Sequence, residues 1–329
     1  MTRKTILIIA VLIVFFGGVV VLKHDREGAG IREKITFAVA KMYLSAPIYV
    51  AHDKGFFARE GVDVTLQPHL SGRDALASVI NGQAQFASSA ETPVMFAGLK
   101  GEKIFIIASI GDSNNHLKIV CRKDRGITGP QDLRGKTVGV LRGAAPEYFL
   151  DVFLTYNGLK KDNIHIVDTK AEETTDAIAE GKIDAAVTWE PLLTAQLKTL
   201  RDNATLLTND RIYNLQWTIV AGQAFVKVHR DTVRKLLRAL IKANEYIASN
   251  PGDAKAITAR HVSEESVSFS DYIFDVRLGQ SLLLNLETQA RWAIRYRLTD
   301  KKDVPNFLPM MFTEGLEAID PEAVTVIHK

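Results

Sequence analysis

The chain has 329 residues, enough for two domains that each bury a core. Its 41 basic and 38 acidic residues give a net charge of +3, and no basic run is interleaved with aromatic residues. This balance argues against a nucleic-acid-binding protein, because binding to phosphates depends on clustered positive charge. The single cysteine excludes an intramolecular disulfide. The histidines lack metal-ligand spacing, so we expect neither a metal site nor another cofactor.

The first 33 residues differ in kind from those that follow. Arg3 and Lys4 precede an uncharged run, 5–22, and a charged tether follows it. Positive charge before an apolar segment is typical of an export signal. The run approaches the ~18 residues that can cross a bilayer, which favours an uncleaved signal anchor, with a cleaved signal peptide as the alternative. Either interpretation predicts a periplasmic protein, and the first anchors it to the inner membrane through residues 5–22.

From Lys34 onward, short apolar runs alternate with helical segments. The first half predicts a strand at 35–40, a helix at 47–60, a strand at 62–66, a helix at 74–81 and a strand at 86–88. The second half predicts a strand at 137–141, a helix at 146–157, a strand at 164–167, a helix at 172–180 and a strand at 185–188. Strands that alternate with helices in this way indicate βαβ units and mostly parallel sheets.

The two halves of the chain carry proline, glycine and glutamate at matching positions. Three pairs of residues stand 99 positions apart: Pro47 and Pro146, Gly82 and Gly181, and Glu91 and Glu190. A unit of this length that occurs twice predicts two similar lobes and not a solenoid.

Two extended apolar segments, 117–123 and 217–226, are expected to cross between these lobes. Helices expected at 231–250, 270–286 and 288–297 then have only the first lobe to pack on. The predicted division is therefore 34–117 plus 225–329 for lobe I, and 118–224 for the hinge strands and lobe II. Two lobes joined by two strands can close over a ligand.

Helix starts are the best candidates for a binding site. Pro47, Pro93, Pro146 and Pro191 each follow a strand and open a helical run, a position that suits proline because its missing N–H would be unpaired there. Capping alone explains each junction taken singly. Together they predict helix N-termini at the carboxyl edges of two facing sheets, where free N–H groups favour an anionic ligand.

Two acidic residues complicate this prediction. Glu91 and Glu190 lie just before or at helix starts, where a carboxylate can simply cap N–H groups. If they face inward instead, the ligand must also carry a positive or hydrogen-bond-donating group. The sequence offers no nucleophile or phosphate loop beside them, so we expect no catalytic residue.

The stretch from Ala46 to Val64, APIYVAHDKGFFAREGVDV, resembles the opening of periplasmic binding proteins of the nitrate, sulfonate and taurine type. That group includes the domain shared with thiamine-pyrimidine-precursor proteins. Four further segments are similar, namely 81–87, 132–140, 181–186 and 189–191. The resemblance implies an α/β, two-lobed periplasmic-binding-protein fold (type II) with a two-strand hinge. It also implies a receptor that delivers its ligand to an ABC permease.

The resemblance carries ligand contacts onto Tyr43, Ser45, Ser71, Gly72, Ser89, Glu91, Thr92, Gly143, Ala144, Ala145 and Trp189. The positions of loops, crossings and helix starts add Asn115, Arg142, Glu190 and Trp217. An acidic residue at Glu91 departs from what a plain oxyanion receptor prefers, which weighs against nitrate or a simple alkanesulfonate.

We therefore expect a monomeric, non-enzymatic receptor for a small organic ligand, anionic or zwitterionic, that is sulfonate-, nitrate-, taurine- or pyrimidine-like. The missing cysteine cluster of the thiamine-pyrimidine enzymes argues against catalysis. A cleft enzyme of the same fold, acting on a pyrimidine-type metabolite, and a ligand-sensing ectodomain are the alternatives.

Overall fold

The computed structural model describes residues 32–208 and 212–327. The apolar run at 5–22 lies outside these residues, so the export signal and the membrane anchor stay predictions. None of the helices in the described ranges combines the length and the apolar character that a membrane span requires.

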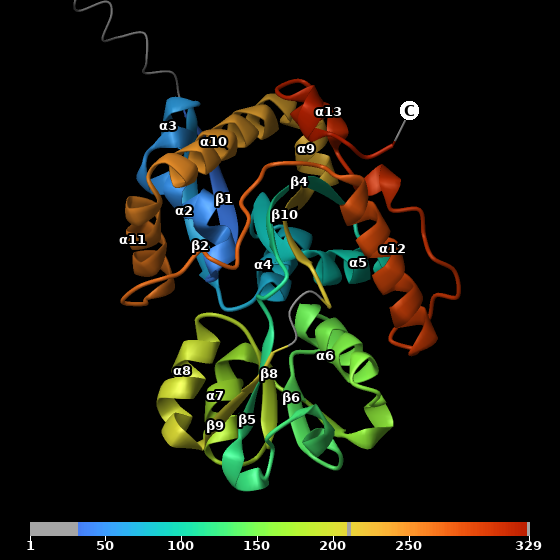
Figure 1. Cartoon of the computed structure of the whole chain (residues 1–329). Coiled ribbons are helices and arrows are strands. Elements are labelled where there is room, and N and C mark those ends of the chain that lie inside the picture. Colours follow the sequence, from blue (N-terminus) through green and yellow to red (C-terminus); the bar gives the residue numbers. More distant parts are fainter. Residues whose placement is uncertain (1–31, 209–211, 328–329) are drawn as a thin grey trace, which may run out of the picture.

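Two lobes, each built on a five-stranded sheet, make up the described chain (Figure 1). Lobe I has the strand order β2-β1-β3-β10-β4. Its strands are β1 (Glu33–Ala40), β2 (Val62–His69), β3 (Phe86–Ala90), β4 (Ile104–Ser113) and β10 (Leu215–Gly222). β1 runs parallel to β2 and β3, whereas β10 runs antiparallel to both of its neighbours.

Lobe II repeats this arrangement with the strand order β7-β6-β8-β5-β9. Its strands are β5 (Lys118–Arg122), β6 (Thr137–Val140), β7 (His165–Asp168), β8 (Ala185–Thr188) and β9 (Ala204–Leu207). β6 is parallel to β7 and β8, and β5 is antiparallel to β8 and β9. Each sheet therefore takes a strand that enters from the opposite lobe, β10 in one and β5 in the other, at the equivalent position. The predicted α/β two-lobed fold is confirmed.

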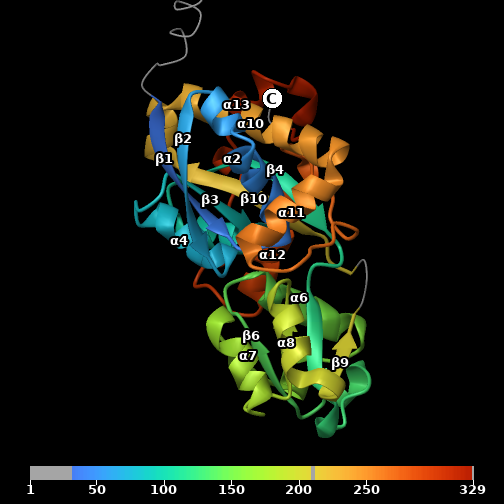
Figure 2. The ribbon, with the colours of Figure 1, turned by 90° about the vertical axis from the view of Figure 1, so that its left-hand side faces the viewer.

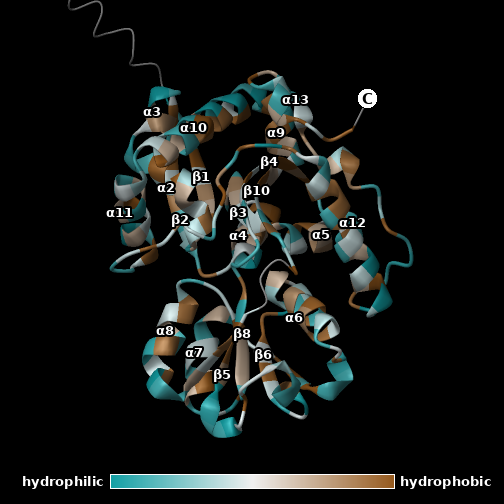
Figure 3. Ribbon diagram, in the orientation of Figure 1, coloured by the Kyte–Doolittle hydropathy of each residue, from teal (hydrophilic) through white to brown (hydrophobic). Residues whose placement is uncertain are grey.

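Helices flank both sheets. They are α2 (Ala46–Asp53), α3 (Phe56–Arg59), α4 (Gly72–Ile80), α5 (Glu91–Lys100), α6 (Ala145–Tyr156), α7 (Ala171–Ala179), α8 (Leu192–Leu200), α9 (Gln223–Val228), α10 (Arg230–Ser249), α11 (Pro251–Val262), α12 (Gln280–Arg295) and α13 (Thr313–Glu317). α10 buries a stripe that includes Leu236, Leu237 and Leu240, and its solvent face is hydrophilic (Figure 3). Such an amphipathic pattern is what a helix needs to cover a core.

The helices after β10 pack on lobe I, as the sequence predicts. α10 and α11 contact α2 (Figure 2), and α12 contacts α5 (Figure 1). Two details of the sequence prediction are wrong. The expected helix at 47–60 is two helices, because Gly55 adopts a left-handed backbone (φ +68°) between them. The expected helix at 270–286 begins only at Gln280, because residues before it extend along β4 through bridges such as Ile273 with Asp112.

The boundary of the second crossing also differs from the prediction. The sequence assigns residues up to 224 to the hinge and lobe II, yet β10 lies inside the lobe I sheet between β3 and β4. Its apolar residues, Trp217 and Ile219 among them, are buried there by antiparallel pairing. The chain therefore returns to lobe I before Leu215, between β9 and β10. An apolar, extended segment has the same sequence pattern whether it crosses between lobes or forms a central strand. The sequence therefore misplaces this boundary.

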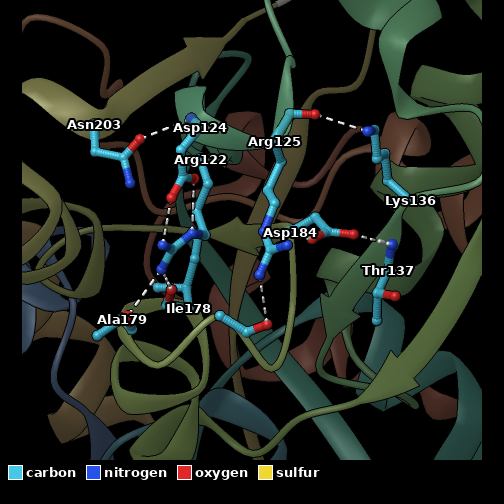
Figure 4. Close-up of polar contacts among 10 residues, drawn as sticks. Arg122, Asp124, Arg125, Lys136, Thr137, Ile178, Ala179, Asp184 and Asn203 are labelled. Atoms are coloured by element: carbon cyan, nitrogen blue, oxygen red, sulfur yellow. Dashed lines mark hydrogen bonds and ion pairs between the residues drawn. The ribbon is translucent and has the colours of Figure 1, made fainter.

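A polar network at the far end of lobe II joins β5 to the C-terminus of α7 (Figure 4). Arg122 donates through Nη1 to the carbonyl oxygens of Ile178 (2.7 Å) and Ala179 (2.8 Å), and it pairs with Asp124 at 2.7 Å. A cation at this position satisfies the last carbonyls of a helix and interacts favourably with its dipole.

We expect the Arg122→Ala variant to lower the free energy of unfolding by about 1–3 kcal/mol, because it removes the guanidinium donor from two helix-end carbonyls, those of Ile178 and Ala179. Urea unfolding followed by circular dichroism measures this change. Arg134→Ala is the control, because within the described part of the chain the one hydrogen bond of the Arg134 side chain is a long bond of 3.4 Å to Gln131. Equal midpoints for the two variants would contradict the role given to Arg122.

Candidate functional site

A narrow cleft lies where the two lobes meet. It is lined by Met42, Ser71, Gly72, Arg73, Ala90, Pro93, Leu215 and Trp217 from lobe I, by His116 and Leu117 from the first crossing, and by Leu141, Ala144, Ala145, Pro146 and Trp189 from lobe II. Its volume is about 30 Å³. That space holds about two water molecules. The lobes therefore stand close together, and an organic ligand needs them to separate before it can enter.

The starts of three helices reach this cleft. Gly72 of α4, Ala145 of α6 and the N-cap residue Ala90 of α5 are all lining residues. Ser71 caps α4 by accepting a hydrogen bond from the Asp74 N–H (3.1 Å). The N-cap residues of α5 and α6 are alanines, whose side chains accept no hydrogen bond. Helix N-termini from both lobes thus direct their positive ends at one gap, which favours a negatively charged group.

Two tryptophans form walls of the cleft, and they differ in their hydrogen bonding. The Trp217 indole N–H donates to Ser45 Oγ (3.2 Å), and its ring lies against Gly72, where a Cβ atom would stand 2.9 Å from Trp217 Cη2. The Trp189 indole nitrogen is buried without a hydrogen-bond partner among the described residues. An unpaired buried donor costs free energy, so the indole N–H of Trp189 is available for a hydrogen bond to an acceptor.

Arg73 supplies a formal positive charge at the edge of the cleft. Its Nη1 donates to the carbonyl oxygen of Arg142 across the two lobes (2.7 Å). Beyond this bond the cleft continues into a groove of about 450 Å³, which is lined by residues of α4, α5 and the start of lobe II, including Arg73, Phe96, Arg142, Gly143 and Glu147. Arg73 therefore stands between the closed cleft and a larger, open groove.

His116 enters the cleft from the first crossing as a neutral imidazole. Burial, followed by the nearby positive charge of Lys118, lowers its pKa to about 3. Its Nδ1 lies 3.3 Å from the hydroxyl of Tyr272. A neutral imidazole can donate or accept one further hydrogen bond but carries no charge to attract an anion.

The structure brings together six of the fifteen predicted ligand contacts. Those that line the cleft are Ser71, Gly72, Ala144, Ala145, Trp189 and Trp217. Arg142 and Gly143 line the neighbouring groove. The others lie outside the lining, namely Tyr43, Ser45, Ser89, Glu91, Thr92, Asn115 and Glu190.

Internal hydrogen bonds account for several of these exclusions. The Ser45 hydroxyl donates to the Ala40 carbonyl (2.8 Å) and accepts from Trp217. Asn115 accepts a hydrogen bond from the ammonium of Lys118 at its carbonyl oxygen (2.8 Å). Glu190 accepts from the backbone N–H (3.2 Å) and the hydroxyl (2.8 Å) of Thr194, and the first of these bonds is the capping role that the sequence also allows. Arg73 and His116 also line the cleft, although neither is among the fifteen predicted contacts; each is the chain neighbour of a predicted residue, Gly72 and Asn115.

Glu91 lies away from the cleft, inside lobe I. It is fully buried and accepts hydrogen bonds from the Tyr213 hydroxyl, the Gln216 backbone N–H (2.9 Å) and the Gln289 side chain (2.9 Å). Burial raises the pKa of its carboxyl to about 7, although these donors partly offset the shift. Glu91 therefore connects α5 with β10, with α12 and with Tyr213, which lies in the segment between β9 and β10. Its side chain does not line the cleft.

An aromatic cluster extends this contact into lobe II. Tyr148 of α6 packs edge-on against Tyr213, with ring centroids 5.2 Å apart, and against Trp292 of α12, with centroids 5.1 Å apart. Through Tyr213 the Glu91 network and these rings form one continuous set of contacts between lobe I and lobe II.

Residues 44–254 match the family described as NMT1/THI5 like. The chain belongs to this family. The family resemblance predicted from the sequence motifs is confirmed. Among curated relatives, a 4-amino-5-hydroxymethyl-2-methylpyrimidine phosphate synthase of Aspergillus parasiticus is 27% identical over 239 residues, which cover 68% of this chain and 69% of that protein.

Solved structures show the same fold. The alkanesulfonate-binding protein SsuA from Xanthomonas axonopodis pv. citri, bound to MOPS, superposes with a TM-score of 0.73 at 15% identity, over 86% of this chain and 99% of that one. The periplasmic nitrate-binding protein NrtA from Synechocystis PCC 6803 superposes with a TM-score of 0.69 at 13% identity, over 89% and 90%. At these identities the likeness concerns the fold and not the ligand.

The raised pKa of Glu91 predicts a dependence of stability on pH. The unfolded chain releases this proton near pH 4.5 and the folded chain near pH 7, so between these values the folded state binds more protons. The free energy of unfolding of the native chain should therefore fall as pH rises through this window, by on the order of 3 kcal/mol.

Urea unfolding at several pH values measures this effect as a difference between the native chain and Glu91→Gln, in which the group cannot titrate. The difference should change between pH 4.5 and 7. A difference that stays constant across this range would refute the assignment.

Proposed function

We propose that this protein is a non-catalytic, extracytoplasmic solute receptor that closes its two lobes over a small organic anion or zwitterion and delivers it to an ABC permease. The family, the shared fold of sulfonate- and nitrate-binding proteins, and the predicted export signal support this proposal. In this function residues 1–33 export or anchor the chain, which acts as a monomer.

The observation that carries the ligand class is the charge pattern of the cleft. Helix N-termini, the unpaired indole N–H of Trp189 and the guanidinium of Arg73 lie around it. None of the described residues that line the cleft is an aspartate or a glutamate. Donors and positive charge without a carboxylate favour a sulfonate, nitrate, carboxylate or similar oxyanion.

The position of Glu91 strengthens this ligand class. In the sequence its acidic side chain weighs against a plain oxyanion, because a carboxylate beside an anion is unfavourable. In the structure the hydrogen-bond donors of Tyr213, Gln216 and Gln289 surround it within lobe I. The ligand therefore needs no amino group to pair with Glu91, and simple alkanesulfonates stay candidates beside taurine.

An enzyme acting on a pyrimidine-type metabolite is the second candidate, because the synthase of Aspergillus parasiticus matches 68% of this chain. Among the described residues that line the cleft, His116 is the one whose titratable side chain suits proton transfer. Its pKa of about 3 lies far from neutral, whereas an efficient general base titrates near the working pH. The receptor is therefore the better-supported function.

We expect Trp189→Phe to weaken the binding of ethanesulfonate or taurine by about 10- to 100-fold, because it removes a hydrogen bond to a charged group while retaining an aromatic wall. Isothermal titration calorimetry on the purified chain measures the affinity.

Trp292→Phe is a matched control. Its indole nitrogen is also buried, but Trp292 lies on α12 and lines a different groove. An equal loss in both variants, or no binding of either anion to the native chain, would count against the proposed ligand class. Turnover of a pyrimidine substrate by the purified chain would favour the enzyme.

A further inference from the structure

We propose that His52, Asp53 and His261 form a binding site for Zn²⁺ on lobe I, away from the ligand cleft. The three side chains come from the C-terminal ends of α2 and α11, two helices that pack against each other. Imidazole nitrogens and one carboxylate are a common ligand set for zinc. This inference does not depend on the proposed function.

The distances between the ligand atoms suit a shared ion. Nδ1 of His52 lies 3.0 Å from Oδ1 of Asp53, and Nε2 of His261 lies 2.8 Å from the same oxygen. All three atoms lie within 4.8 Å of one another. Zinc bonds of about 2.0–2.2 Å in a tetrahedron separate neighbouring ligand atoms by roughly 3.3 Å. Small rotations of these side chains therefore make room for the ion.

The surroundings also favour a cation. His52 and His261 lie in the last turns of their helices, where the backbone dipole places its negative end.

Neighbouring residues hold two of the ligands in place. The ring of His261 stacks on the ring of Tyr49, with centroids 4.4 Å apart and planes at 6°. Arg260 donates through Nη2 to Oδ2 of Asp53 (3.2 Å), which leaves Oδ1 facing the two imidazoles. Contacts behind the ligands commonly fix their orientation in metal sites.

Solvent can reach the site. The side chains of His52, Asp53 and His261 are 40%, 23% and 25% exposed. A groove of about 520 Å³ runs beside them, lined also by Tyr49 and Arg260. Three protein ligands leave one position open, which water or a ligand atom can fill. Because Asp53 and His261 are 208 positions apart, no sequence spacing reveals this cluster.

Calorimetric titration with ZnCl₂ tests the site, using the full chain without a polyhistidine tag. We expect one Zn²⁺ per chain, with affinity at least about 100-fold weaker in His52→Gln and in His261→Gln, since even outer contacts of zinc sites are worth about 10- to 100-fold. His165→Gln, on the exposed edge strand β7, should bind as the native chain does. Zinc should also raise the melting temperature of the native chain and of His165→Gln, but not that of the other two variants.

Two results would overturn the proposal. The first is no stoichiometric Zn²⁺ binding to the native chain, which would leave the three residues as a hydrogen-bonded cluster only. The second is binding that His52→Gln and His261→Gln retain, which would place the ion elsewhere. Two separate ligand variants keep the test decisive if one of them fails to fold.

Discussion

In each lobe, the helices that follow parallel strands begin at the same edge of the sheet. The position of the binding cleft depends on this geometry. The repeat places two such edges opposite each other across a hinge. Helix starts of α4 and α5 in lobe I and of α6 in lobe II therefore meet at a single cleft. Their converging dipoles need no lysine to make the gap positive, and Arg73 adds a charge at its edge.

The hinge is connected to the cleft through Glu91, Tyr213 and Tyr148, whose side chains do not line the cleft themselves. Glu91 is the first residue of α5, whose N-cap residue lines the cleft. The carboxylate of Glu91 accepts a hydrogen bond from the hydroxyl of Tyr213, which lies between β9 and β10. Tyr148, three residues beyond the start of α6, packs on Tyr213. The buried carboxylate thus contacts the segment that returns to lobe I, and it belongs to the same helix, α5, that begins at the cleft.

The fold can be predicted from the sequence, because the repeated proline and glycine positions and the alternating apolar runs are recognisable within short stretches of the chain. The sequence predicted Gly72, Ala144 and Trp189 at the cleft for the same reason, since each follows a strand at the sheet edge. It could not show that the carboxylate of Glu91 turns into lobe I, because its partners Gln216 and Gln289 lie more than a hundred residues away. Partners distant in sequence likewise hide the pairing of β10 and the meeting of His52 with His261.

We infer that helix N-termini from both lobes hold an anion in the closed cleft. A crystal structure of the chain with an anion that calorimetry shows to bind examines this inference. We expect oxyanion oxygens within hydrogen-bond distance of Trp189 Nε1 and of backbone N–H groups at the start of α6, with residues of both lobes around them. An anion bound on one lobe alone, or outside the cleft, would contradict it.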